Sequence, residues 1–317
     1  MISAERLTKR FGAFTAIEDV SFEVAGGEIV GFLGPNGAGK STTMRILAGV
    51  FPPSHGQVRV AGYDVARQPL AARTAVGYFP ERVALYTDMT VESYLTYVGE
   101  MKGRRRRVAR QDAAAAMESC SVSPVAGRLI GTLSKGFRQR VGIAQALVGK
   151  PRVLILDEPT AGLDPEQVAD MRTLIRQLRH ERTVILSTHI LSEVEATCDR
   201  VIIIRRGRIV ALDTPANLNR RVRQGTQIII EVRGPRDAVL AALRAEPGVL
   251  SADAATDPSA QADTVTATIT TSSERDLREA LAACVLRHGW GLRELRPRTL
   301  TLEEIFLALT ADGGPAS

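Results

Sequence analysis

The sequence lacks any long apolar run. No stretch of about 18 or more consecutive apolar residues occurs, and a membrane-spanning helix needs one of at least that length. The opening residues, MISAERLTKRFG, carry charges but no apolar segment behind them, which excludes a secretory signal peptide. These two absences predict a cytoplasmic protein.

Cysteine is scarce as well. The three cysteines, Cys120, Cys198 and Cys284, lie far apart and form no CxxC pair. This excludes a disulfide framework and a cysteine-based metal site, and it fits a reducing compartment. We expect all three side chains to act as small buried hydrophobic groups.

Aromatic residues make up only 4% of the chain and do not alternate with its cations. A platform that stacks single-stranded nucleic acid needs such aromatics, so we expect no nucleic-acid partner. The net charge of +6 could still attract nucleic acid or an anionic membrane face through electrostatics alone. The densest basic run, Gly103–Arg107, is predicted to be the solvated end of a helix.

What the chain does have is enough material for two domains, with 317 residues of which 44% are hydrophobic. Short strands are predicted over residues 2–30, and helices over residues 84–150. Buried apolar strands then alternate with helices up to residue 220. This alternation predicts an α/β domain over residues 1–220 with a mostly parallel sheet.

A second pattern begins near residue 221. Its order is β-α-β-β-α-β, which predicts a small ferredoxin-like α+β domain over residues 221–310. Ser272 or Ser273 would cap its second helix. A capping box of Thr301 and Glu304 would start a closing helix, and residues 311–317 are expected to form a disordered tail.

One stretch matches a phosphate-binding loop. The sequence GPNGAGKST fits the pattern G-x-x-x-x-G-K-[ST] and lies between a predicted strand and a predicted helix. Its backbone N–H groups would surround phosphate oxygens, Lys40 would reach the β- and γ-phosphates, and Ser41 would bind Mg²⁺. The candidate ATP-binding residues are Gly34, Pro35, Asn36, Gly37, Ala38, Gly39, Lys40, Ser41 and Thr42.

Two later strands end in acids and a histidine that could act together with the phosphate-binding loop. VLILDE ends in Asp157, a candidate Mg²⁺ ligand, and Glu158, which would polarise the attacking water. His189 ends the strand TVILSTH, where ligands of open α/β sheets bind. His55, His180 and His288 are expected to be structural.

A second anion site is indicated by LSKGFRQR, residues 133–140. Ser134 and Gly136 stand where a loop starts a helix, and such a helix start suits an anion. The chain therefore carries two phosphate-binding patterns almost a hundred residues apart.

Taken together, these motifs resemble those of the ATP-binding subunit of an ABC transporter over residues 2–220. The resemblance implies that LSKGFRQR is the signature motif, that Ala161–Asp164 is the D-loop, and that His189 is the switch histidine. It also implies that Phe11 stacks on adenine. Asp164 and Glu81 join the expected ATP site, with Glu81 also near Mg²⁺.

In that family two subunits face each other head to tail. The resemblance therefore implies that Ser134 and Gly136 touch the γ-phosphate held by a second chain. Since each motif occurs once, the simplest assembly is a homodimer that binds two ATP molecules with Mg²⁺.

This sequence departs from the family pattern at three positions. Lys135 and Phe137 replace a Gly and a Gln of the usual signature, and Glu81 stands where the family more often has Gln. A carboxylate at position 81 could reach the metal, but it cannot donate a hydrogen bond unless it is protonated.

The motifs look most like a branch that pairs with a separately encoded membrane permease, often for export, and includes gliding-motility-type and drug-export ATPases. The chain would then lie on the inner face of the membrane, and its second domain, with Trp290 in the core, would regulate or contact the dimer. The alternatives are a soluble ABC-type ATPase acting on nucleic acid or ribosomes, and a binding module without catalysis. A soluble ATPase of that kind usually fuses two ATP domains or inserts a long coiled coil. Neither feature is present in this sequence, which counts against that alternative.

Overall fold

The computed structural model describes residues 1–179, 182–222, 227–254, 264–271 and 277–298. The chain divides into two compact units, Met1–Pro215 and Ala216–Ser317. This division falls a few residues before the boundary at 220 that the sequence predicted. Each unit is described by itself below.

A six-stranded sheet forms the centre of the first unit, in the order β10-β9-β3-β8-β7-β6. All neighbouring strands are parallel except β10, which runs antiparallel to β9. Every residue of β3, β7 and β8 is buried, as the near-continuous apolar runs predicted. The strands are β3 (Ile29–Leu33), β6 (Val76–Phe79), β7 (Val153–Asp157), β8 (Thr183–Thr188), β9 (Arg200–Arg205) and β10 (Arg208–Asp213).

A second, antiparallel sheet has the order β2-β1-β4-β5. Its buried side chains, such as Leu7 and Ile17, share one hydrophobic cluster with Phe32 of the central sheet and Met44 of the first helix. The two sheets therefore enclose one core. The strands are β1 (Ile2–Phe11), β2 (Phe14–Val24), β4 (His55–Val60) and β5 (Tyr63–Asp64).

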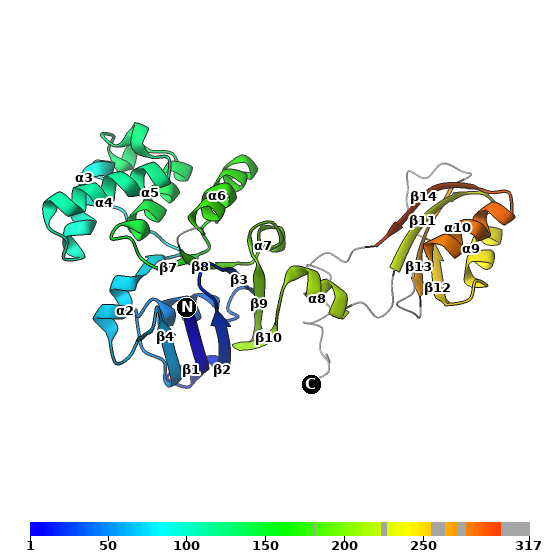
Figure 1. Ribbon diagram of the computed structural model, residues 1–317, viewed down its shortest axis with the longest axis horizontal. Coiled ribbons are helices and arrows are strands. Elements are labelled where there is room, and N and C mark those ends of the chain that lie inside the picture. Colours follow the sequence, from blue (N-terminus) through cyan, green and yellow to red (C-terminus); the bar gives the residue numbers. More distant parts are fainter. Residues whose placement is uncertain (180–181, 223–226, 255–263, 272–276, 299–317) are drawn as a thin grey trace. The chain divides into compact units, whose positions relative to one another are not determined.

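Helices occupy most of residues 84–150, as expected, and α3, α4 and α5 pack side by side (Figure 1). Their apolar faces form a second hydrophobic cluster together with Leu154, Leu156 and Leu186 of the central sheet. The helices of the first unit are α1 (Lys40–Leu47), α2 (Pro69–Ala75), α3 (Val91–Met101), α4 (Arg106–Ser119), α5 (Lys135–Leu147), α6 (Pro165–Leu178) and α7 (Leu191–Thr197), with short 3₁₀ turns at Ser123–Val125 and Ile130–Thr132.

The second unit begins within α8 (Pro215–Val222). Its four strands form an antiparallel sheet in the order β12-β13-β11-β14, with α9 and α10 on one face (Figure 1). Trp290 packs against its separate hydrophobic cluster. The elements are β11 (Gln227–Arg233), α9 (Arg236–Arg244), β12 (Val249–Ala254), β13 (Thr264–Thr271), α10 (Arg278–Arg287) and β14 (Gly291–Pro297).

Several sequence expectations concern single side chains. Cys120 and Cys284 are buried and Cys198 is half-buried, as expected for small hydrophobic groups. The arginines of Gly103–Arg107 are exposed at the start of α4, also as expected. The cap at Ser272 or Ser273, the helix with Thr301 and Glu304, His180 and the tail at 311–317 lie outside the described residues.

No helix in the described part of the chain combines the length and apolar character needed to cross a membrane.

Candidate functional site

Two glycines of the phosphate-binding loop, which joins β3 to α1, are required by close packing against β2 and β9. Gly39 has a φ of +108°, and a Cβ there would lie 2.6 Å from Ile17 Cγ2. A Cβ on Gly34 would lie 2.4 Å from the carbonyl oxygen of Ile204. Side chains at these positions would displace the backbone, so the loop can keep its course only with glycine.

This loop forms one wall of an open pocket of about 420 Å³. The ends of three parallel strands add Glu81 after β6, Glu158 and Ala161 after β7, and His189 after β8, and β2 completes the lining with Phe14 and Ala16. Parallel strands bring these positions together because their carboxyl ends share one edge of the sheet. The loop residues that line the pocket are Pro35, Asn36, Gly37, Gly39, Lys40, Ser41 and Thr42.

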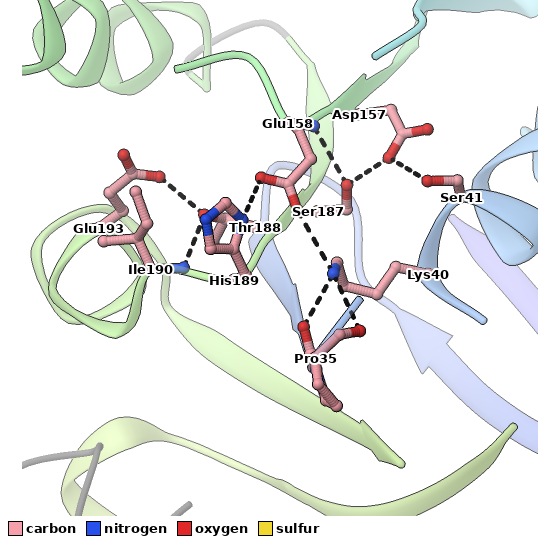
Figure 2. A network of polar contacts seen from close by, with 11 residues as sticks. Pro35, Lys40, Ser41, Asp157, Glu158, Ser187, Thr188, His189, Ile190 and Glu193 are labelled. Carbon is pink, nitrogen blue, oxygen red and sulfur yellow. Dashed lines mark hydrogen bonds and ion pairs between the residues drawn. The ribbon is translucent and has the colours of Figure 1, made fainter. Parts of the chain in front are cut away.

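Lys40 lies at the centre of the polar network in this pocket (Figure 2). Its Nζ donates hydrogen bonds to the carbonyl oxygens of Gly34, at 2.8 Å, and Pro35, at 3.3 Å. The same Nζ lies 3.4 Å from Glu158 Oε1. The Lys40 side chain is nearly buried, so its charge acts where solvent screens it weakly.

Glu158 is held from both its backbone and its carboxylate. Its N–H donates to the carbonyl and hydroxyl oxygens of Ser187, both at 3.1 Å, and its φ is +52°. Its Oε2 lies 2.9 Å from His189 Nδ1 (Figure 2). A left-handed backbone at a residue other than glycine is uncommon and costs energy, and such residues gather at functional sites.

Asp157 provides an oxygen site suited to a divalent cation. The hydroxyls of Ser41 and Ser187 donate to its Oδ1 at 3.1 Å and 2.5 Å. Its Oδ2 is buried and has no hydrogen-bond partner among the described residues. Burial raises the pKa of Asp157, and the charges of Glu81 and Glu158 act in the same direction. A cation bound here would compensate this buried charge, and carboxylate and hydroxyl oxygens are ligands that Mg²⁺ accepts.

The structure adds residues that the sequence analysis missed. Ser187 joins Asp157 to the backbone of Glu158, as described above. Thr188 Oγ1 donates to Glu193 Oε2 at 2.9 Å and accepts from the N–H of Ile190 at 3.0 Å (Figure 2). These bonds hold the turn that carries His189. Ser187 and Thr188 directly precede His189 in the strand TVILSTH, which was the available signal.

The aromatic side chain in this pocket is that of Phe14, which the sequence analysis did not single out. Phe14 pairs with Phe11 across β1 and β2. Phe11 is half-exposed and packs edge-on against Phe51, with ring centroids 5.6 Å apart, and is not among the residues that line the pocket. The stacking of Phe11 on adenine therefore stays a prediction, and Phe14 becomes a second candidate.

Ser134 and Gly136 line a different pocket, of about 370 Å³, together with Leu163 and Gln167 near the start of α6. The Ser134 hydroxyl caps α5 by accepting a hydrogen bond from the N–H of Phe137 at 3.4 Å. Asp164 caps α6 in the same way, accepting from the N–H of Gln167 at 2.9 Å. None of these residues lines the phosphate-loop pocket, so one chain presents the two patterns as separate sites.

Comparisons with known proteins agree with this geometry. The model of the family described as ABC transporter matches residues 17–161. The linearmycin resistance ATP-binding protein LnrL of Bacillus subtilis is 33% identical over 311 residues, which is 98% of each chain. The Nod factor export ATP-binding protein I of Paraburkholderia xenovorans is 37% identical and covers 68% of this chain and 72% of its own. A solved ATP-binding subunit of an ABC transporter superposes with a TM-score of 0.62 at 30% identity, covering 70% of this chain and 92% of that one.

Proposed function

Because this chain belongs to the family of ABC transporter ATP-binding proteins, we propose that it hydrolyses ATP to drive a separate membrane permease. We propose further that the transporter is an exporter. One observation carries the proposal: Lys40, Glu158 and His189 line a single pocket and contact one another, although they come from three separate segments of the chain. Asp157 lies beside this pocket and accepts a hydrogen bond from Ser41, which lines it.

In this proposal Lys40 and the loop N–H groups bind the β- and γ-phosphates of ATP. Ser41, Asp157 and Glu81 would hold Mg²⁺, which would neutralise charge on the phosphates. Glu158 orients the attacking water, and His189 fixes the Glu158 carboxylate through Nδ1. Phosphoryl transfer depends mainly on such positioning and charge neutralisation, so each member of this set has a defined part in hydrolysis.

The complete site needs a second nucleotide-binding chain. Ser134 and Gly136 form a phosphate-binding pattern, but neither residue lines the phosphate-loop pocket of its own chain. In a head-to-tail dimer, these two residues of one copy would cover the ATP bound by the other. ATP binding would close the dimer, and hydrolysis would reopen it.

The export role is supported by the relatives and by a surface of the helical region. The names of two relatives concern resistance and export, and one of them matches this chain along almost its full length. Tyr86 and Tyr97 are half-exposed beside each other, with ring centroids 5.9 Å apart. We propose that these aromatics and the nearby Glu81 contact the permease at the inner face of the membrane.

The second unit is proposed to be a ferredoxin-like module. Its described elements follow the order β-α-β-β-α-β, and its antiparallel sheet places β11 and β13 in the centre. It has its own hydrophobic cluster. We propose that it regulates or contacts the dimer rather than taking part in catalysis.

The experiment that tests this function is a pull-down of the tagged chain from detergent-solubilised native membranes, with mass spectrometry of the proteins that co-purify. We expect a polytopic membrane protein in stoichiometric amount. Recovery with ribosomes or DNA from the soluble fraction alone would contradict the transporter role and support a soluble ATPase instead.

A further inference from the structure

Lys135 connects the start of α5 to the loop that follows β7. The Lys135 Nζ donates a hydrogen bond to the carbonyl oxygen of Gly162 at 2.8 Å. Gly162 has a φ of +67°, and a Cβ there would lie 2.1 Å from this Nζ. The contact therefore depends on lysine at position 135 and on glycine at position 162. Glycine, the usual signature residue at position 135, could not make it.

The loop that Lys135 holds spans both pockets. It starts at Glu158 and continues through Ala161, which lines the phosphate-loop pocket, to Leu163, which lines the Ser134 pocket. Two successive turns stiffen it: the N–H of Ala161 donates to Glu158 O at 3.2 Å, and the N–H of Leu163 donates to Thr160 O at 3.1 Å. A displacement of Gly162 is consequently transmitted to the backbone of Glu158.

Two other contacts pair α5 with α6 and do not involve Gly162. Arg140 forms an ion pair with Asp170 at 2.8 Å. Gly136 packs closely on Gln167, since a Cβ at position 136 would lie 2.9 Å from Gln167 Oε1. Lys135 adds a contact between the start of α5 and Gly162. Gly162 lies two residues before Asp164, the N-cap of α6.

We infer that Lys135 is a positioning residue that fixes Glu158 of its own chain through Gly162. This inference rests on the proposed function, since it concerns the efficiency of ATP hydrolysis. The competing role for Lys135 is an electrostatic contact, across the dimer, with the phosphate bound by the other chain. In the first role, loss of Lys135 affects Glu158 of the same subunit. In the second role, it affects hydrolysis at the site that contains Glu158 of the other subunit.

The first test is steady-state ATP hydrolysis by Lys135→Ala. We expect kcat to fall by about 10- to 100-fold, as when a reacting group is misplaced by about 1 Å, while the KM for ATP stays unchanged. Lys135→Arg should restore most of the rate because a guanidinium can still donate to Gly162 O. Arg110→Ala removes an exposed cation from α4, outside both pockets, and should leave the rate unchanged.

The deciding test uses hybrid dimers, purified through two affinity tags in the presence of Mg·ATP. One copy carries Glu158→Gln, so that only the Glu158 of the other copy can act. When Lys135→Ala is placed on the copy with intact Glu158, we expect hydrolysis to fall. When it is placed on the copy that already carries Glu158→Gln, we expect hydrolysis to equal that of the reference hybrid without Lys135→Ala.

The opposite pattern, with loss only when Lys135→Ala and Glu158→Gln share a chain, would overturn the inference and show contact across the dimer. Equal rates in all hybrids would overturn it as well. Absence of hydrolysis by both the wild-type dimer and the reference hybrid would instead contradict the proposed function, and the inference with it.

Discussion

At the scale of single residues, the site depends on carboxylates whose surroundings differ although they are adjacent in sequence. Asp157 is fully buried and accepts hydrogen bonds from two serine hydroxyls, whereas Glu158 reaches into the pocket between Lys40 and His189. The left-handed φ of Glu158 separates the two side chains. Asp157 therefore suits a metal ion, and Glu158 suits the attacking water molecule.

Replacing Glu158 with Gln tests the proposed base. The amide keeps the size of the side chain but cannot accept a proton, so kcat should fall by about 10²–10⁴-fold. ATP should still bind and should hold the dimer closed. Steady-state hydrolysis and size-exclusion chromatography with Mg·ATP measure the two effects. Glu166→Gln, which changes an exposed acid on α6, is the matched control. Unchanged hydrolysis in Glu158→Gln would refute the assignment.

Replacing Asp157 with Asn tests the metal site. Because the pKa of Asp157 is raised, the carboxylate is penalised in the folded protein above that pKa when no metal is bound. Asn should therefore raise the melting temperature of the metal-free protein at neutral pH. It should also remove the stabilisation by Mg²⁺, which for wild type would reach about 2.7 kcal/mol at 100 times Kd.

The raised pKa of Asp157 also determines how metal binding depends on pH. Protons compete with Mg²⁺ as the pH falls through the raised pKa, so affinity is full above it and is lost below it. A Mg²⁺ titration by calorimetry at several pH values, in the presence of ATP, measures this loss. Affinity that does not change down to the ordinary pKa of aspartic acid would argue against Asp157 as a ligand.

At the scale of secondary-structure elements, helix starts supply the groups for phosphate binding. α1 begins within the phosphate-binding loop, and α5 begins at Ser134. Unpaired N–H groups and the helix dipole favour an anion at each start. The two starts open to separate pockets, and in the proposed dimer they would meet at one phosphate.

A bulky cation at the start of α5 should block the dimer without harming the ATP pocket. In Ser134→Arg, we expect hydrolysis to fall by at least about 100-fold, comparable to the loss of a key phosphate or oxyanion contact. Binding of a fluorescent ATP analogue to the monomer should be unchanged, because Ser134 does not line that pocket. Loss of binding would show that the proposed cross-chain geometry is wrong.

A control separates this effect from the loss of a helix cap. Thr90 caps α3 by accepting a hydrogen bond from the N–H of Ser93 at 3.3 Å. Thr90→Ala and Ser134→Ala should each cost about 1 kcal/mol of stability. Only the change at Ser134 should also slow hydrolysis.

At the scale of the whole molecule, the chain consists of two units with separate hydrophobic clusters. All the residues of the phosphate-loop pocket belong to the first unit. Each unit therefore has the apolar core that independent folding requires.

A chain that ends at Val222 tests whether the second unit affects dimer formation or hydrolysis. It should bind ATP with the affinity of the full chain, because the pocket residues are retained. We expect dimer formation or the rate of hydrolysis to change, which would support a regulatory role for the second unit. Calorimetry with ATP and sedimentation of the Mg·ATP complex measure these properties. Identical behaviour of the two chains in every assay would contradict that role.

Much of the first unit could be predicted because its signals are local. The glycines at 34, 37 and 39 and the apolar strands before Asp157 and His189 indicate both the fold and the members of the site. The contribution of Phe14 could not be predicted, because the resemblance pointed to Phe11 and the hairpin between them determines which ring faces the pocket. The bond from Lys135 to Gly162 joins residues 27 positions apart and has no local signal.

The sequence by itself determined the chemistry: a phosphate-binding loop, two acids, a histidine and a second helix start, in one order along the chain. Short-range patterns encode these because backbone conformation and hydrophobic periodicity act over a few residues. Only the tertiary structure decided which groups meet. The parallel sheet joins Lys40, Glu158 and His189 at one edge, and Ser187 supports Asp157 there. It also places Lys135 on the loop of Gly162. Such contacts depend on packing between distant segments, which residue spacing does not specify.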